Sequence, residues 1–139
     1  MTERPFHLRL ACNYATEHND VKDLNVEIWV DDQWKTLHLN TKSPGFLLLV
    51  YGLFSCQHLY MRSNCAERNI ILESATGELK LVAGEFWNIQ TVEVAFNAKI
   101  KSGQPSKDDI AYIIDRMGHC PVSTNMPKDI EKKSSMNFD

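Results

Sequence analysis

The sequence lacks the features that mark nucleic-acid-binding, membrane-spanning and secreted proteins. No stretch is densely basic, and 15 Lys and Arg against 18 Asp and Glu give a net charge of −3. A broad attraction to nucleic acid or to anionic lipid is therefore not expected. The beginning of the chain, Met1 to Phe6, lacks the apolar run and the cleavage pattern of a secretory signal. We expect a cytoplasmic protein that binds neither nucleic acid nor membrane.

The chain also lacks an internal repeat and a linker, and its 139 residues leave no room for a second domain. We expect a single domain over residues 1–139. Within it, residues 128–139 are predicted to form a polar C-terminal tail with at most one short strand. Four cysteines without a secretory signal are expected to stay reduced. We therefore interpret them as buried, metal-binding or catalytic thiols.

The longest apolar stretch, Phe46 to Phe54, is much shorter than the roughly 20 residues that a bilayer requires. It predicts a buried helix, roughly Gly45 to Glu67, with Pro44 near its start. Side chains three and four positions apart share a helix face, so one stripe is expected around Cys56. Its members are Leu49, Gly52, Leu53, Leu59 and Tyr60. Cys65, nine residues after Cys56, is expected on the opposite side of the helix.

Most of the remaining chain has the composition and the period of β-strands. The predicted strands are residues 6–12, 26–30, 34–39, 70–74, 79–83 and 91–100. Residues 31–33 are expected to form a hairpin turn, and residues 76–78 a second turn. A second helix is predicted to begin after Ser106, whose hydroxyl suits an N-cap, and to end at Gly118.

Cys120 stands at the start of a short helical turn, in the segment Met117-Gly118-His119-Cys120-Pro121-Val122-Ser123. Pro121 fits the first helical position, which makes Cys120 the N-cap. Free backbone N–H groups at a helix start stabilise a thiolate, and they can lower a cysteine pKa from about 8.5. Cys120 is therefore a candidate redox thiol. The alternative is that it is a capping or buried residue at an ordinary bend.

The segments around Cys56 and Cys120 together resemble the OsmC/Ohr family of osmotically inducible and organic hydroperoxide resistance proteins. That family has one cysteine inside a buried central helix and a second in a Cys-Pro-Val-Ser-like motif some sixty positions later. Ser43-Pro44, Leu47-Leu48-Leu49 and Cys120-Pro121-Val122-Ser123 carry the resemblance, which covers nearly the whole chain. It implies an α+β fold with antiparallel sheets wrapped around a long central helix, in an intertwined homodimer.

The resemblance also implies a thiol-dependent peroxidase with an antioxidant role in the stress response. Cys56 would attack an organic hydroperoxide and become a sulfenic acid, and Cys120 would condense with it to a disulfide. An external dithiol or lipoyl-type reductant would reopen that bond. No other cofactor and no metal is expected. Around Cys56, four side chains are candidates to bind the apolar part of the substrate: Leu49, Leu53, Leu59 and Tyr60.

The sequence departs from the family at the groups that activate the first thiol. In the family, an arginine from the loop after the first strand does so, and a glutamate near the start of the helix orients that arginine. Here Gly45-Phe46 occupies the glutamate position, and residues 15–23 contain no arginine. A thiol beside an apolar wall without a cation has a raised pKa. Arg9 on the first predicted strand is our candidate replacement.

Two other interpretations remain open at this stage. The first is a non-catalytic OsmC-like dimer that binds a small apolar or thiol ligand between its central helices. The second is a zinc site built from Cys56, His58, His119 and Cys120, which have suitable ligand types. Residues two apart on a helix point about 200° apart, which disfavours the zinc site.

Overall fold

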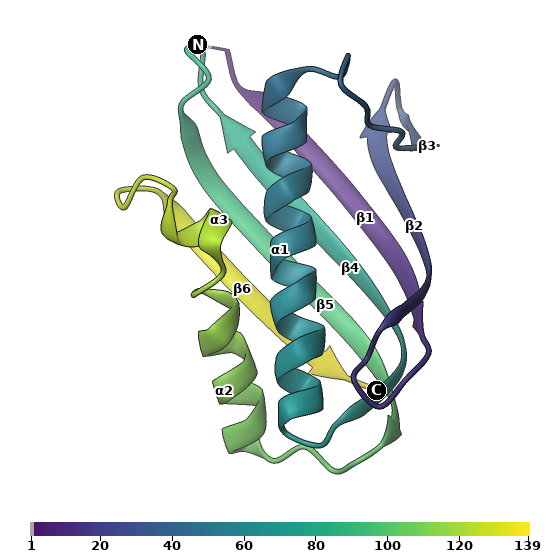
Figure 1. Ribbon diagram of the computed structural model, residues 1–139. Coiled ribbons are helices and arrows are strands. Elements are labelled where there is room, and N and C mark those ends of the chain that lie inside the picture. The colour runs from purple at the N-terminus through teal and green to yellow at the C-terminus, as the bar shows by residue number, and fades with distance from the viewer. Residues whose placement is uncertain (1) are drawn as a thin grey trace.

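The computed structural model describes residues 2–139, which form one six-stranded sheet covered on one face by helices (Figure 1). The strands are β1 (Arg4–Tyr14), β2 (Val21–Val30), β3 (Gln33–Thr36), β4 (Ile71–Ala83), β5 (Ile89–Ser102) and β6 (Glu131–Phe138). Their order is β3-β2-β1-β4-β5-β6, and only the β5–β6 pair is parallel. The helices are α1 (Gly45–Glu67), α2 (Lys107–Met117) and α3 (Pro121–Thr124). The predicted α+β class is confirmed.

Helix α1 has the predicted bounds and crosses the middle of the sheet, with α2 and α3 along one side (Figure 1). Its buried side chains are Val50, Leu53, Phe54, Gln57, His58, Met61, Asn64 and Cys65. They pack on strand residues that point to the same side, such as Leu8, Leu79 and Phe96. Fully burying an apolar side chain of this size contributes about 1.5–3 kcal/mol. The opposite face of α1 leaves Leu48, Leu49 and Leu59 exposed.

The predicted turn at residues 76–78 is wrong, because β4 continues without a break from Ile71 to Ala83. Gly77 lies opposite Phe96 of β5. A Cβ atom at Gly77 would come within 2.6 Å of the Phe96 ring. The missing side chain makes room for that ring, which stacks on Phe54 of α1 with the ring centroids 5.9 Å apart. Gly77 therefore marks a close approach inside a strand.

The second helix begins and ends where the sequence predicted. The Ser106 side chain accepts a hydrogen bond from the Asp109 backbone N–H, and the Asp109 carboxylate accepts one from Ser106 N–H. This reciprocal capping box satisfies two backbone donors at the start of α2. Gly118 follows the last helical residue, and Cys120 is the N-cap of α3.

The end of the chain is more ordered than a polar tail. Eight of its residues form β6, which pairs in parallel with β5 along its whole length. The alternation of a strand turns Ser134, Met136 and Phe138 to one face, and Met136 is buried in the core. The hairpin turn predicted at residues 31–33 is present, with positive φ at Asp31 and Asp32. Among the helices of residues 2–139, none is long and apolar enough to cross a membrane.

Candidate active site

Cys56 and Cys120 meet at the side of α1 that faces α3. The Cys56 side chain projects from the middle of α1 and is partly exposed, whereas Cys120 at the N-cap of α3 is fully buried. The two thiols hydrogen-bond with one another, and the backbone N–H of Val122 donates to Cys56. Both side chains are free thiols. Two cysteines from distant parts of the sequence thus form one site.

The surroundings of Cys56 disfavour its thiolate. Burial, opposed by the hydrogen bond from Val122 N–H and reinforced by the neighbouring Cys120 thiol, raises the pKa of Cys56 to about 11. No cation contributes to this value within the described chain. Because the thiolate is the nucleophilic form of cysteine, only a small fraction of Cys56 is reactive at neutral pH.

Cys120 instead receives hydrogen bonds from two nitrogen donors. Gln57 Nε2 donates to Cys120 Sγ at 3.2 Å, and Ser123 backbone N donates to the same sulfur at 3.4 Å. The Gln57 amide also donates to the Met117 carbonyl at 2.6 Å and accepts from Ser134 Oγ at 2.8 Å. Every polar atom of this buried amide is therefore used.

A lysine lies next to this network. Lys132 Nζ, from β6, donates to the Ser123 carbonyl at 3.0 Å and to Ser123 Oγ at 3.4 Å. Sequence reasoning missed Gln57, Lys132 and Ser134. For the two β6 residues a signal was available: Lys132, Ser134 and the apolar Met136 repeat every two positions, in a segment predicted as a polar tail with at most one short strand. That period turns all three side chains to the face that carries the helices.

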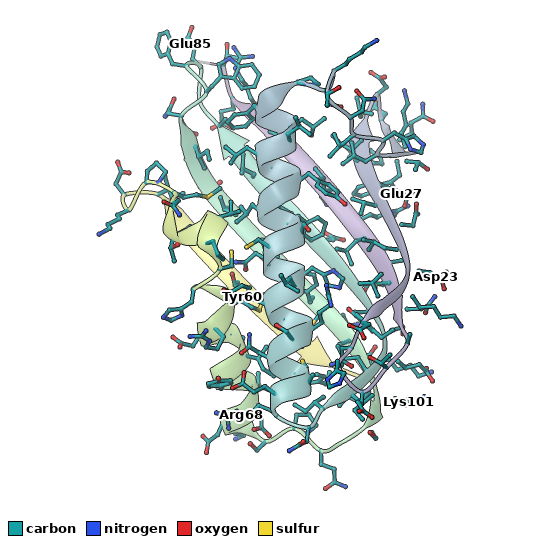
Figure 2. All side chains as sticks on the ribbon, viewed as in Figure 1. Asp23, Glu27, Tyr60, Arg68, Glu85 and Lys101 are labelled. Carbon is teal, nitrogen blue, oxygen red and sulfur yellow. The ribbon has the colours of Figure 1, made fainter. Side chains whose placement is uncertain are left out.

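The structure does not bring Arg9 to Cys56 within this chain. Its neighbours Leu8 and Leu10 face α1, so the alternation of β1 turns Arg9 to the other face of the sheet. There Arg9 Nε donates to the Glu27 carboxylate at 2.7 Å, and the guanidinium lies 4.1 Å from the centroid of a Trp34 ring. Glu27 lies on β2, next to the edge strand β3 and across α1 from α3 (Figure 2).

The predicted substrate-binding residues do not share one surface. Leu49 lines a shallow apolar hollow of about 430 Å³ beside α3. The other residues of this hollow are Ile89, Pro121, Val122, Asn125, Met126 and Pro127. Leu59 lies on the outer face of α1, 45% exposed, and Tyr60 is half-buried. Leu53 is only 2% exposed, because α1 is rotated so that Val50, Leu53 and Phe54 pack on the sheet.

His58 belongs to a different network, on the sheet side of α1. Its Nε2 shares a 2.7 Å hydrogen bond with the Tyr14 hydroxyl, and its ring stacks on Phe96. Burial, together with the charge of Arg62, lowers the pKa of His58 to about 4. His119 is exposed and donates to the Asp115 carbonyl. In the part of the chain that the structure describes, no three His, Cys, Asp or Glu side chains are grouped as metal ligands.

A long helix across one face of a six-stranded sheet, with a cysteine at its middle close to a second cysteine at a short helix start, defines the fold and the site to be compared with known proteins. A scan against models of known protein families gives no match, and a search of curated proteins gives none either.

Three of the similar structures are OsmC-like proteins. An OsmC-like hydroperoxide resistance protein from Jannaschia sp. CCS1 has a TM-score of 0.57 and 12% identity, over 87% of this chain and 85% of that one. An OsmC-like protein from Mycoplasma pneumoniae has a TM-score of 0.55 and 12% identity, over 82% of this chain and 88% of that one. An OsmC-like protein of unknown function from Vibrio cholerae has a TM-score of 0.52 and 12% identity, over 94% of this chain and 98% of that one. The chain has the OsmC-like fold, as the resemblance of its two cysteine segments predicted.

Proposed function

We propose that the protein is a thiol-dependent peroxidase that reduces organic hydroperoxides. The observation that carries the proposal is the meeting of a partly exposed Cys56 thiol with a buried Cys120 thiol. The apolar hollow that Leu49 and Val122 line lies beside them, with room for the apolar part of a substrate. Similarity to a structure described as a hydroperoxide resistance protein supports the same class of reaction.

In the proposed reaction, the Cys56 thiolate attacks the terminal oxygen of the hydroperoxide. The O–O bond breaks, the alcohol leaves with a proton, and Cys56 becomes a sulfenic acid. The Cys120 sulfur then attacks the Cys56 sulfur, which forms the S–S bond and releases hydroxide that is protonated to water. An external dithiol or lipoyl-type reductant reopens the disulfide by thiol–disulfide exchange. Because the pKa of Cys56 is about 11, the first step is slow at neutral pH and accelerates as pH rises.

We also propose that the working form is an intertwined homodimer. The outer face of α1 carries Leu48, Leu49 and Leu59 without a partner in the described chain. A second copy packed against this face would bury them and would exclude water from the neighbourhood of Cys56. The active site would then lie at the subunit interface.

A second candidate function is the binding of a small apolar or thiol ligand between the central helices, without catalysis. Two observations favour this candidate. The pKa of Cys56 is raised, and no cation among the described residues lowers it. A thiol that stays protonated is a poor nucleophile toward peroxides.

Consumption of hydroperoxide in the presence of a dithiol separates the two functions. We expect Cys56→Ser to abolish turnover, and Cys120→Ser to allow one oxidation without recycling through the disulfide. Cys12→Ala, in a buried thiol outside the site, is the matched control and should keep turnover. Bulky organic hydroperoxides should react faster than hydrogen peroxide, because buried apolar area contributes about 25 cal/mol per Å². Equal slow rates for wild type and Cys56→Ser would favour ligand binding.

Peptide mapping under non-reducing conditions gives an independent readout of the thiol pair. After treatment with an organic hydroperoxide, Cys56 and Cys120 should be joined, while Cys12 and Cys65 should remain thiols. Cys12 and Cys65 are both buried, whereas Cys56 is partly exposed, and burial raises the pKa of Cys65 to about 12 and also raises that of Cys12. A bridged Cys65 would contradict the proposed pair.

A further inference from the structure

The side-chain amide of Gln57 has a fixed orientation. The Met117 carbonyl can only accept a hydrogen bond, so the amide nitrogen of Gln57 must be the atom 2.6 Å from it. The amide oxygen then lies toward Ser134 Oγ, which donates to it at 2.8 Å. One N–H of the amide remains, and it points at Cys120 Sγ, 3.2 Å away. Gln57 thus directs a single donor at this sulfur.

A second donor reaches the same sulfur. The Ser123 backbone N–H lies 3.4 Å from Cys120 Sγ. A neutral thiol sulfur is a weak acceptor, whereas a thiolate accepts such hydrogen bonds strongly. Gln57 and Ser123 together fix the position of the Cys120 sulfur.

We propose that Gln57 is a positioning residue that directs the Cys120 sulfur at Cys56. The Gln57 amide acts through Cys120 and does not itself touch the substrate. In turnover, which rests on the proposed peroxidase function, the thiolate form of this sulfur attacks the sulfenic acid of Cys56. The S–O bond breaks, its electron pair leaves with hydroxide, and the S–S bond forms. The hydroperoxide is the oxidant that converted the Cys56 thiolate to the sulfenic acid.

The charged and titratable groups around Cys120 are consistent with this assignment. Lys132 on β6 donates to the carbonyl and the hydroxyl of Ser123, whose backbone N–H donates to the Cys120 sulfur. Cys56 on α1 is neutral. At the end of α2, His119 and Asp115 are exposed, and they pair with one another. Solvent screens their effect on the buried sulfur.

Ultraviolet absorbance of the thiolate near 240 nm tests the inference without any peroxide. The titration of Cys120 is the difference between the full-length Cys56→Ser variant and the Cys56→Ser/Cys120→Ser variant. Adding Gln57→Met, which keeps the length of the side chain but removes its N–H, should raise the midpoint by about one pH unit or more. Ser134→Ala removes only the group that orients the amide and should give a smaller rise. Ser63→Ala, a hydroxyl elsewhere on α1, should give none.

Because Gln57→Met and Ser134→Ala both alter this network, the titration still gives an answer if Gln57→Met fails to fold. Circular dichroism identifies such a variant, and Ser134→Ala then decides alone. If the midpoint of Cys120 is unchanged in the folded variants, Gln57 has only a structural role and the proposal is wrong.

A second measurement follows the sulfenic acid in the chain with both cysteines. After one equivalent of an organic hydroperoxide, trapping with a 1,3-dione and mass spectrometry should show disulfide formation about tenfold slower in Gln57→Met. Equal rates in wild type and variant would overturn the positioning role. If Cys56 is never oxidised in wild type, the proposed peroxidase function fails, while the absorbance titration still decides the role of Gln57.

Discussion

Two successive buried residues of α1 belong to two different polar networks. Gln57 serves the thiol pair, and His58 serves the hydroxyl of Tyr14. Both side chains are almost fully buried, so each must satisfy its polar atoms inside the protein. They respond differently to pH, because the amide of Gln57 does not titrate and the imidazole of His58 does.

His58 should make the protein less stable in mild acid. Its pKa is about 4 in the folded chain against an ordinary value of 6.5. Between these values the unfolded chain binds a proton that the folded chain does not, so the free energy of unfolding falls as pH falls. The slope is at most about 1.4 kcal/mol per pH unit, and stability is unaffected by this group above pH 6.5. Urea unfolding at several pH values between 4.5 and 7.5 measures it.

His58→Gln should remove most of this slope, whereas His119→Gln, in an exposed side chain, should retain it. A slope that persists unchanged in His58→Gln would assign the acid sensitivity to other groups.

At the scale of elements, the packing of β4 on β5 depends on the absence of a side chain at Gly77. We expect Gly77→Val to lower the free energy of unfolding by about 1–3 kcal/mol, because the new side chain meets the Phe96 ring. Gly45→Ala is the matched control, since a Cβ there has no neighbour within 4 Å. Denaturant unfolding compares the two variants. Equal stability of Gly77→Val and wild type would show that Phe96 can move aside without cost.

The elements that the sequence predicted well are those whose signals are local. The bounds of α1 follow from a continuous apolar stretch behind Pro44, and the start of α2 follows from the Ser106 cap. Gly77 misled the prediction because a glycine among polar residues is also typical of a turn. Its real cause, the Phe96 ring, lies on another strand. Residues 128–139 were predicted as a polar tail with at most one short strand, because only the alternation of β6, not its composition, indicates a strand.

The candidate site divides in the same way. Cys56 and Cys120 could be found from the chemistry of their own segments. The role of Gln57 could not be predicted, because it depends on Ser134 of β6. Ser134 lies beside Gln57 only because β6 pairs in parallel with β5. Arg9 was the best cation in the expected region, but the strand alternation that buries its neighbours turns it to the opposite face.

For the whole molecule, the outer face of α1 sets the expected assembly. We predict a homodimer at micromolar concentration, which light scattering coupled to gel filtration can measure. Leu59→Lys places a charge on this face and should yield a monomer. Leu24→Lys changes an equally exposed leucine on β2 and should leave the dimer intact. A folded wild-type monomer would contradict the interface and, with it, an active site shared between subunits.

The position of β6 as the last strand affects the order in which the site is completed. A chain made from its N-terminus exposes the Cys56 segment first and the Cys120 segment much later. Ser134, which orients Gln57, and Lys132, which is bound to Ser123, follow within the final strand. Until those residues have been synthesised and paired with β5, Gln57 lacks the group that orients its amide toward Cys120. The set of donors around Cys120 is therefore completed only once β6 is in place, after most of the core can already form.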